Sequence, residues 1–154
     1  MYKGIQMRSR LEARFAGNLD NLHAEWSYEG EAYASGTKQY LPDFRVDEDW
    51  FIEVKPYTNS KENDPNKILD AMGVIAESRP DRDTYLALAT PDLGSLLYCE
   101  YVPDPATPYQ RQRGMAAFFP DFECCFLLPM FGPYEYDIPH WIAGGMGVID
   151  WGWK

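Results

Sequence analysis

The sequence predicts an α/β protein in which a mixed β-sheet is flanked by helices. Two segments repeat apolar residues at helical spacing, and the stretches between them alternate apolar and polar residues as strands do. The run 85–89 is almost continuously apolar, which is typical of a strand covered on both faces. Through residue 102, these segments follow the order helix, three strands, helix and two strands.

Length and composition favour one domain with its own core. The chain has 154 residues, of which 45% are hydrophobic, and a chain of this size can bury a core without disulfides or a structural metal. We therefore treat residues 1–154 as one domain, with a core over about 5–102 and a C-terminal extension over about 103–154. The sequence has no run of 18 apolar residues and no signal-peptide pattern, so we expect no membrane span.

Cysteine and histidine usage excludes several kinds of site. Cys99, Cys124 and Cys125 are odd in number and two of them are adjacent, which predicts reduced thiols and a cytoplasmic protein. His23 and His140 match no zinc-ligand spacing. The sequence also contains no Gly-rich phosphate loop of the G-x-x-x-x-G-K-[ST] kind.

The first helix is expected over about residues 8–22. Leu11, Phe15 and Leu19 recur at helical spacing and fall within roughly 80° of one another, at about 100° per residue. Glu12 lies about 20° beyond Leu19, at the edge of this apolar stripe. Its carboxylate is therefore predicted to point along the seam between helix and sheet.

Three strands are expected next. The first covers 24–29, and 30–36 is predicted to be a loop. The second covers 38–46 and the third 50–55, and the polar turn 47–49 between them predicts a hairpin.

The second helix has a clear start and end. Asn63 and Asp64 offer a cap, Pro65 suits the first helical position, and Pro80 ends the segment. Two strands follow, over 85–89 and over 95–102.

The last third has few structural signals. The stretch 116–128 is apolar but is interrupted by Pro120, and we assign no structure to the region from Gly132 onward. Trp141, Trp151 and Trp153 lie in that region. Their ordinary role would be core packing, and the alternative is a docking site for a protein partner.

Acidic residues and a lysine gather in the predicted hairpin. The residue numbers of Asp43 and Glu53 add up to 96, twice 48. The two residues therefore face each other across neighbouring strands if the turn centres on residue 48. Lys55 shares the face of Glu53, while Ile52 and Val54 take the opposite face and pack into the core. A Glu-x-Lys pattern alone is equally typical of a solvated hairpin face, so the interpretation depends on all the acids converging.

These residues carry a resemblance to a known superfamily. Three segments, 8–12 (RSRLE), 41–44 (LPDF) and 52–55 (IEVK), resemble the motifs of the PD-(D/E)XK nucleases. They are similar to phage Holliday-junction-resolving endonucleases and to the endonuclease subunits of heteromeric transposases. The resemblance covers about residues 5–90. It implies a restriction-endonuclease-like core of the order α-β-β-β-α-β and a metal-dependent DNA endonuclease in a bacterial or phage-infected cell.

The resemblance also implies roles for individual residues. Asp43, Glu53 and the backbone carbonyl of Val54 would bind Mg²⁺ or Mn²⁺, and Glu12 would complete the metal shell. Lys55 would assist the attacking water or stabilise the developing charge.

Three further residues are candidates for contact with DNA. Arg8 and Arg10 would touch phosphate, although ion pairs on a solvated helix face are equally compatible with the sequence. Gln39 has a counterpart near the site in some branches of the superfamily, and its ordinary role is that of a surface glutamine. Cleavage of both strands of a duplex would imply a homodimer, because one site cuts one strand.

The net charge of −10 opposes simple nucleic-acid binding through charge. Residues 1–60 hold 7 basic and 10 acidic side chains, and residues 61–154 hold 7 and 14, so the half with the candidate site is the less acidic. Two alternatives to an endonuclease stay open: a catalytically silent DNA-binding or assembly module of the same fold, and a recombination exonuclease.

Overall fold

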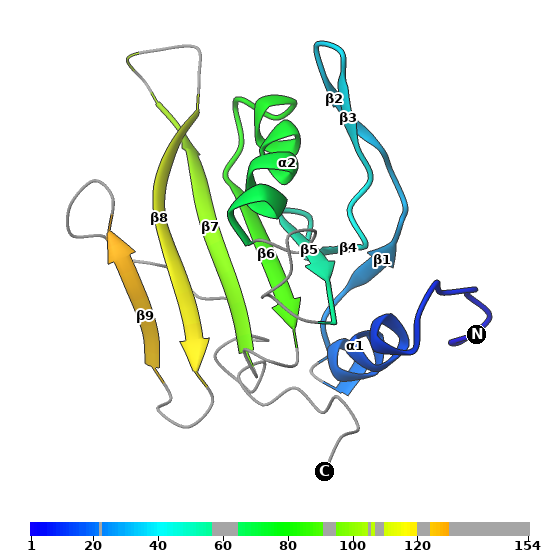
Figure 1. The fold of residues 1–154 in the computed structure, drawn as a ribbon. Coiled ribbons are helices and arrows are strands. Elements are labelled where there is room, and N and C mark those ends of the chain that lie inside the picture. The colour runs from blue at the N-terminus through cyan, green and yellow to red at the C-terminus, as the bar shows by residue number, and fades with distance from the viewer. Residues whose placement is uncertain are drawn as a thin grey trace.

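The computed structural model describes residues 1–21, 23–56, 65–90, 95–104, 106, 110–119 and 124–129. Within these ranges the protein is an α/β structure, with a seven-stranded mixed sheet, a two-stranded sheet and two helices (Figure 1). The predicted α/β class is confirmed. The elements are α1 (Arg10–Asn21), β1 (Trp26–Tyr28), β2 (Tyr33–Ser35), β3 (Lys38–Tyr40), β4 (Phe44–Val46), β5 (Trp50–Val54), α2 (Pro65–Glu77), β6 (Thr84–Thr90), β7 (Ser95–Pro103), β8 (Gln110–Phe119) and β9 (Cys124–Pro129).

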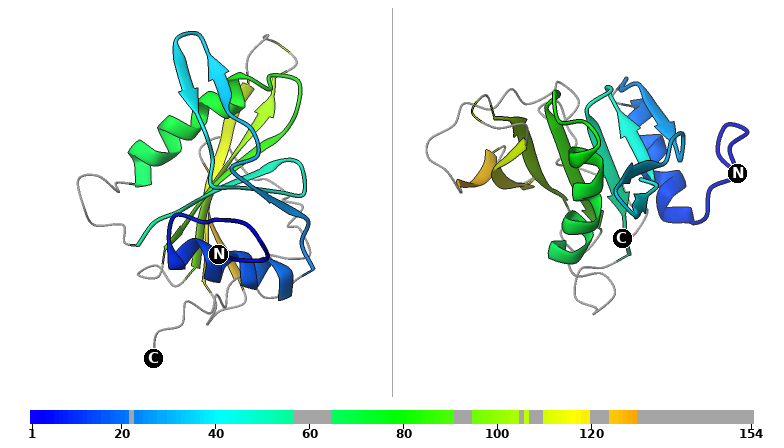
Figure 2. Two further views of the ribbon diagram at one scale, coloured as in Figure 1. Left: turned by 90° about the vertical axis from the view of Figure 1, so that its right-hand side faces the viewer. Right: turned by 90° about the horizontal axis from the view of Figure 1, so that it is seen from above.

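The large sheet has the strand order β1-β4-β5-β6-β7-β8-β9. Its one parallel pair is β5 with β6, and the other neighbours run antiparallel. Two parallel strands cannot be joined by a tight turn, so the chain crosses over through α2 between β5 and β6. The small β2–β3 hairpin lies beside α2, whereas α1 lies toward the other end of the molecule (Figures 1 and 2).

The central strands have apolar layers on both faces. In β5, Ile52 and Val54 join the cluster beneath α1, which includes Phe15 and Leu19. Phe51 points the other way and joins the cluster beneath α2. All five residues of β5 are buried. Successive side chains of the strand point to opposite faces of the sheet, and here each face is covered by an apolar cluster and not by water. Glu53 points to the same face of the sheet as Phe51, so protein covers it as well.

The hairpin register agrees with the sequence prediction. Phe44 pairs with Ile52, Arg45 with Phe51, and Val46 with Trp50, so each pair sums to 96. Asp47 and Glu48, two of the three residues between the paired Val46 and Trp50, adopt positive φ angles of 49° and 69°, a conformation that tight hairpin turns often use.

The predicted second strand, 38–46, is wrong in its extent. The chain forms β3, leaves the strand conformation at 41–43, and then forms β4 in the other sheet. Pro42 has no N–H to donate to a ladder, which favours the break at this point. The predicted loop 30–36 is also wrong, because it contains β2, which pairs with β3.

The second helix agrees closely with the prediction, since α2 begins at Pro65 and ends at Glu77, before Pro80. The two predicted strands after it are present as β6 and β7. Beyond them, β8 and β9 extend the sheet through most of the apolar stretch 116–128. The tail with Trp141, Trp151 and Trp153, and also His140, lies outside the described residues.

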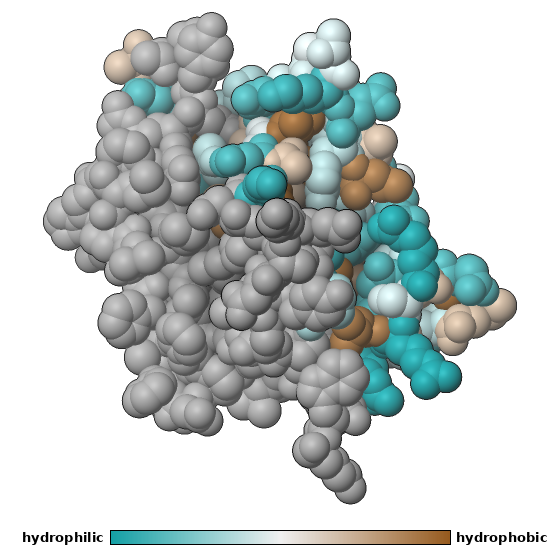
Figure 3. Space-filling view, viewed as in Figure 1, coloured by the Kyte–Doolittle hydropathy of each residue, from teal (hydrophilic) through white to brown (hydrophobic). Residues whose placement is uncertain are grey.

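The visible surface of the described part is mainly hydrophilic, with small separated apolar areas (Figure 3). Its large exposed apolar side chains are Met1, Ile5 and Leu41. Neither described helix has the length and apolar character required to cross a membrane.

Candidate active site

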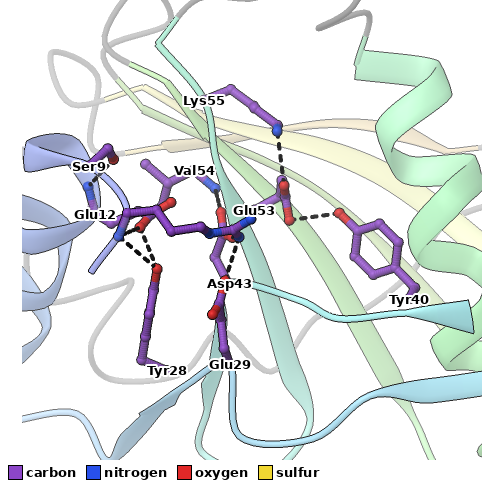
Figure 4. A network of polar contacts seen from close by, with 10 residues as sticks. Ser9, Glu12, Tyr28, Glu29, Tyr40, Asp43, Glu53, Val54 and Lys55 are labelled. Atoms are coloured by element: carbon purple, nitrogen blue, oxygen red, sulfur yellow. Dashed lines mark hydrogen bonds and ion pairs between the residues drawn. The ribbon is translucent and has the colours of Figure 1, made fainter. Parts of the chain in front are cut away.

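Three carboxylates from separate parts of the chain lie near the end of β5 (Figure 4). Glu12 comes from the first turn of α1, Asp43 from the residue before β4, and Glu53 from β5 itself. Their exposed fractions are 6%, 1% and 6%, which is unusual for acidic side chains. Burial of an ionised carboxylate is costly unless donors and positive charge surround it. Each of the three has such partners.

Glu12 is fixed by the start of α1. The Ser9 hydroxyl accepts a hydrogen bond from the Glu12 N–H at 3.2 Å and so caps the helix. The Glu12 carboxylate accepts one hydrogen bond from the Tyr28 hydroxyl, at 2.6 Å, and another from the Arg8 N–H, at 3.0 Å. This arrangement resembles a capping box, which has the pattern Ser-x-x-Glu. Glu12 therefore has a structural role whatever its chemistry.

Asp43 is the most enclosed of the three acids. One of its carboxylate oxygens accepts the N–H of Val54 at 2.9 Å, and the other accepts the Arg8 guanidinium at 2.8 Å. The same guanidinium nitrogen contacts Glu29 at 2.5 Å. Arg8 thus bridges Asp43 and a fourth carboxylate at the edge of the site.

Glu53 lies between a lysine and a tyrosine. One oxygen is 3.1 Å from the Lys55 ammonium group, and the other accepts the Tyr40 hydroxyl at 2.6 Å. Burial, followed by the charge of Glu53, raises the pKa of Tyr40, so its hydroxyl remains a donor at neutral pH.

The charges in the site act on one another. Burial first, and then the negative charges of Glu53 and Glu12, raise the pKa of Asp43 to about 7, although the Val54 N–H and Arg8 oppose the rise. The site therefore holds more negative charge than Arg8 and Lys55 neutralise. A bound cation would relieve this repulsion.

The carboxylates carry hard oxygen donors, which Mg²⁺ and Mn²⁺ prefer. In the described part of the chain, however, no three His, Cys, Asp or Glu side chains are grouped closely enough to hold a metal ion. The carboxylate oxygens point to Tyr28, Arg8, Val54, Tyr40 and Lys55. The donor chemistry fits a divalent cation, and the side chains would have to exchange these partners to bind one.

The sequence prediction named the four central residues that meet here: Glu12, Asp43, Glu53 and Lys55. It left Arg8 either as a phosphate contact or as part of an ion pair on a solvated helix face. In the structure Arg8 precedes α1, and its guanidinium binds the buried Asp43.

The other two predicted DNA contacts lie elsewhere. Arg10 is exposed on α1, and Gln39 is exposed in the β2–β3 hairpin. Within the described part of the chain, neither forms a hydrogen bond or ion pair with the three carboxylates.

Sequence reasoning missed four residues of this network. The signal for Ser9 was present as Ser-x-x-Glu, and Tyr28 stood in the first predicted strand, 24–29. Nothing local marked Tyr40 or Glu29, because their partners depend on how the chain folds back on itself.

No protein-family model matches this sequence, and no curated protein matches it either.

Proposed function

We propose that this protein is a metal-dependent DNA endonuclease with a restriction-endonuclease-like core of the PD-(D/E)XK type. One observation carries the proposal: three buried carboxylates and a lysine, separated widely in sequence, converge at the end of one strand. A protein core accepts such a costly cluster at functional sites more readily than elsewhere. The superfamily resemblance of the same four residues gives the cluster its chemical meaning.

Asp43, Glu53, Glu12 and the carbonyl of Val54 would hold the cation. Bound Mg²⁺ or Mn²⁺ would polarise the phosphodiester and lower the pKa of water at the site. The protein's own part is to present the oxygens from rigid elements, in a surrounding that excludes bulk water.

Lys55 is the group best suited to act on the attacking water. Its side chain is about one-third exposed and its ammonium group contacts Glu53, so it can reach both the carboxylates and a substrate at the surface. The attacking water passes one proton to a neighbouring water as its oxygen adds to phosphorus, and the bond from phosphorus to the 3′ oxygen breaks. The leaving oxygen takes a proton, which leaves 5′-phosphate and 3′-hydroxyl ends, as the superfamily resemblance implies.

A nicking assay on supercoiled plasmid at low salt tests the proposal. Wild-type protein should nick with Mn²⁺ or Mg²⁺ and not with EDTA, whereas Asp43→Ala and Lys55→Ala should lose the activity while remaining folded. Lys67→Ala removes an exposed lysine from α2 and serves as the control. Wild-type nicking by either folded site variant would refute the site assignment. A plasmid circle has no ends, so nicking would also exclude a pure exonuclease.

The silent binding or assembly module remains the second candidate. Its support is that Arg8 already occupies Asp43 and that the described acids are not grouped for a metal. A folded protein that binds DNA but neither binds Mn²⁺ nor cuts would establish this alternative.

A further inference from the structure

Arg8 is shared between two carboxylates through a single nitrogen. That nitrogen lies 2.8 Å from an Asp43 oxygen and 2.5 Å from a Glu29 oxygen. The Asp43 side chain is 2% exposed, whereas that of Arg8 is 63% exposed. One guanidinium nitrogen therefore lies against both carboxylates, while most of the Arg8 side chain is exposed at the surface.

Glu29 is built firmly into this position. Its backbone N–H donates to the Asp43 carbonyl oxygen at 2.9 Å. Its φ angle is +44°, in the left-handed region that non-glycine residues rarely adopt. A residue persists in such a conformation only where its surroundings impose it. A glycine, such as the neighbouring Gly30, adopts a positive φ angle at lower cost than a glutamate. Position 29 nevertheless holds a glutamate, and its side chain contacts Arg8.

Arg8 and a divalent cation would compete for Asp43. The Asp43 oxygen that contacts Arg8 is the one not engaged by the Val54 N–H, so it is the oxygen available to a cation. When Asp43 turns to a cation, Arg8 loses this partner but keeps Glu29. A guanidinium retained at the rim of a metal site suits a phosphodiester oxygen, with which it forms strong charge-assisted hydrogen bonds.

We propose that Glu29 is a positioning residue: it retains Arg8 at the site so that Arg8 exchanges Asp43 for the substrate phosphodiester when Asp43 binds the cation. This inference rests on the proposed function. It assigns Glu29 a task distinct from metal ligation, and it makes Arg8 both a competitor of the cation and a contact of the substrate.

A double-mutant cycle on Mn²⁺ affinity tests the exchange. Calorimetric titrations compare wild type, Arg8→Ala, Glu29→Gln and the double variant. Arg8→Ala should bind Mn²⁺ more tightly, because Asp43 no longer has a competing partner. Glu29→Gln should bind at least about threefold more weakly, because Arg8 is then held by Asp43 alone, whereas the same change in the Arg8→Ala background should have little effect. Glu31→Gln, an exposed acid nearby, controls for the loss of one charge.

The outcomes separate this inference from the proposed function. If Glu29→Gln weakens Mn²⁺ binding equally in both backgrounds, Glu29 is itself a ligand and the positioning role is overturned. If the protein binds Mn²⁺ and nicks DNA but the two substitutions show no coupling in Mn²⁺ affinity, the exchange of Arg8 is overturned. The proposed nuclease function then still stands. A wild-type protein that binds no Mn²⁺ contradicts both. The expected coupling, together with a higher KM for DNA in Arg8→Ala, supports the exchange.

Discussion

Asp43 illustrates how burial and neighbouring charge act on one carboxyl group. It has two good hydrogen-bond donors, yet its pKa rises to about 7, because it is buried beside two other acids. Metal ligation requires the ionised form. Cation binding at this site should therefore weaken as the pH falls below about 7.

The same shift predicts a pH-dependent stability. Since the folded-state pKa of Asp43 exceeds its ordinary value of 3.8, the folded protein binds more protons than the unfolded chain between pH 3.8 and about 7. The free energy of unfolding should fall as the pH rises through that window, by at most about 4 kcal/mol from this group. Asp43→Asn should remove the fall, which urea unfolding in EDTA at several pH values would measure. The exposed Asp81→Asn should retain the wild-type slope, and an unchanged slope in Asp43→Asn would contradict the assignment.

At the scale of single elements, α1 and β5 position the acids for different reasons. Glu12 is presented by a capped helix start, where Ser9 satisfies one N–H of the first turn. Glu53 is presented by a strand that is buried on both faces, so its oxygens depend on Tyr40 and Lys55. The β4–β5 turn sets the register between Asp43 and that strand.

Ser9→Ala should loosen the start of α1. Loss of an N-cap hydroxyl lowers the free energy of unfolding by about 1 kcal/mol, which corresponds to roughly 2–4 °C in Tm for a domain of this size. Thermal unfolding followed by circular dichroism would measure the change, with Thr37→Ala in the exposed hairpin turn as the control. A wild-type Tm in Ser9→Ala would show that the capping arrangement of Ser9 and Glu12 does not stabilise α1.

At the scale of the whole molecule, binding of a divalent cation should raise thermal stability. A ligand at a hundredfold excess over its Kd stabilises the folded state by about 2.7 kcal/mol, or roughly 5–10 °C in Tm here. We expect this rise with Mn²⁺ in the wild type and expect little of it in Asp43→Ala. An equal rise in both proteins would place the cation elsewhere.

The charge distribution of the described residues indicates where the proposed nuclease would contact DNA. Arg10 and Arg14 lie on the exposed side of α1 and border a shallow pocket with Tyr2 and Asn21. Within the described part of the chain they join no ion pair, unlike most of the other basic residues. Those that do pair with acids are Lys3, Arg8, Arg45, Lys55, Arg79 and Arg82.

Replacing Arg10 and Arg14 by alanine should therefore weaken DNA binding and reduce its salt dependence. If each contacts one phosphate, the slope of log K against log salt should fall by about 1.8. Fluorescence anisotropy of labelled duplex would measure the slope. Lys38→Ala with Lys67→Ala removes the same charge from exposed positions on β3 and α2. Equal losses in the two double variants would attribute the effect to net charge alone.

Local signals in the sequence were enough to predict the α/β class, the start of α2 and the register of the β4–β5 hairpin. Together with the superfamily resemblance, they also indicated that Glu12, Asp43, Glu53 and Lys55 lie close together. Helical periodicity, a proline at a helix start and residue spacing across a tight turn all act over a few positions. Glu12 was predicted at a buried seam and is buried there. These features needed no knowledge of distant partners.

Only the tertiary structure decided how the site is completed. The segment 38–46 divides between two sheets, which its alternating pattern could not reveal because strand periodicity does not specify a partner. Tyr40 meets Glu53 across 13 positions, and Arg8 meets Asp43 across 35. Such contacts arise when the chain packs α1 and the hairpins around β5, and burial then requires a donor for each acid.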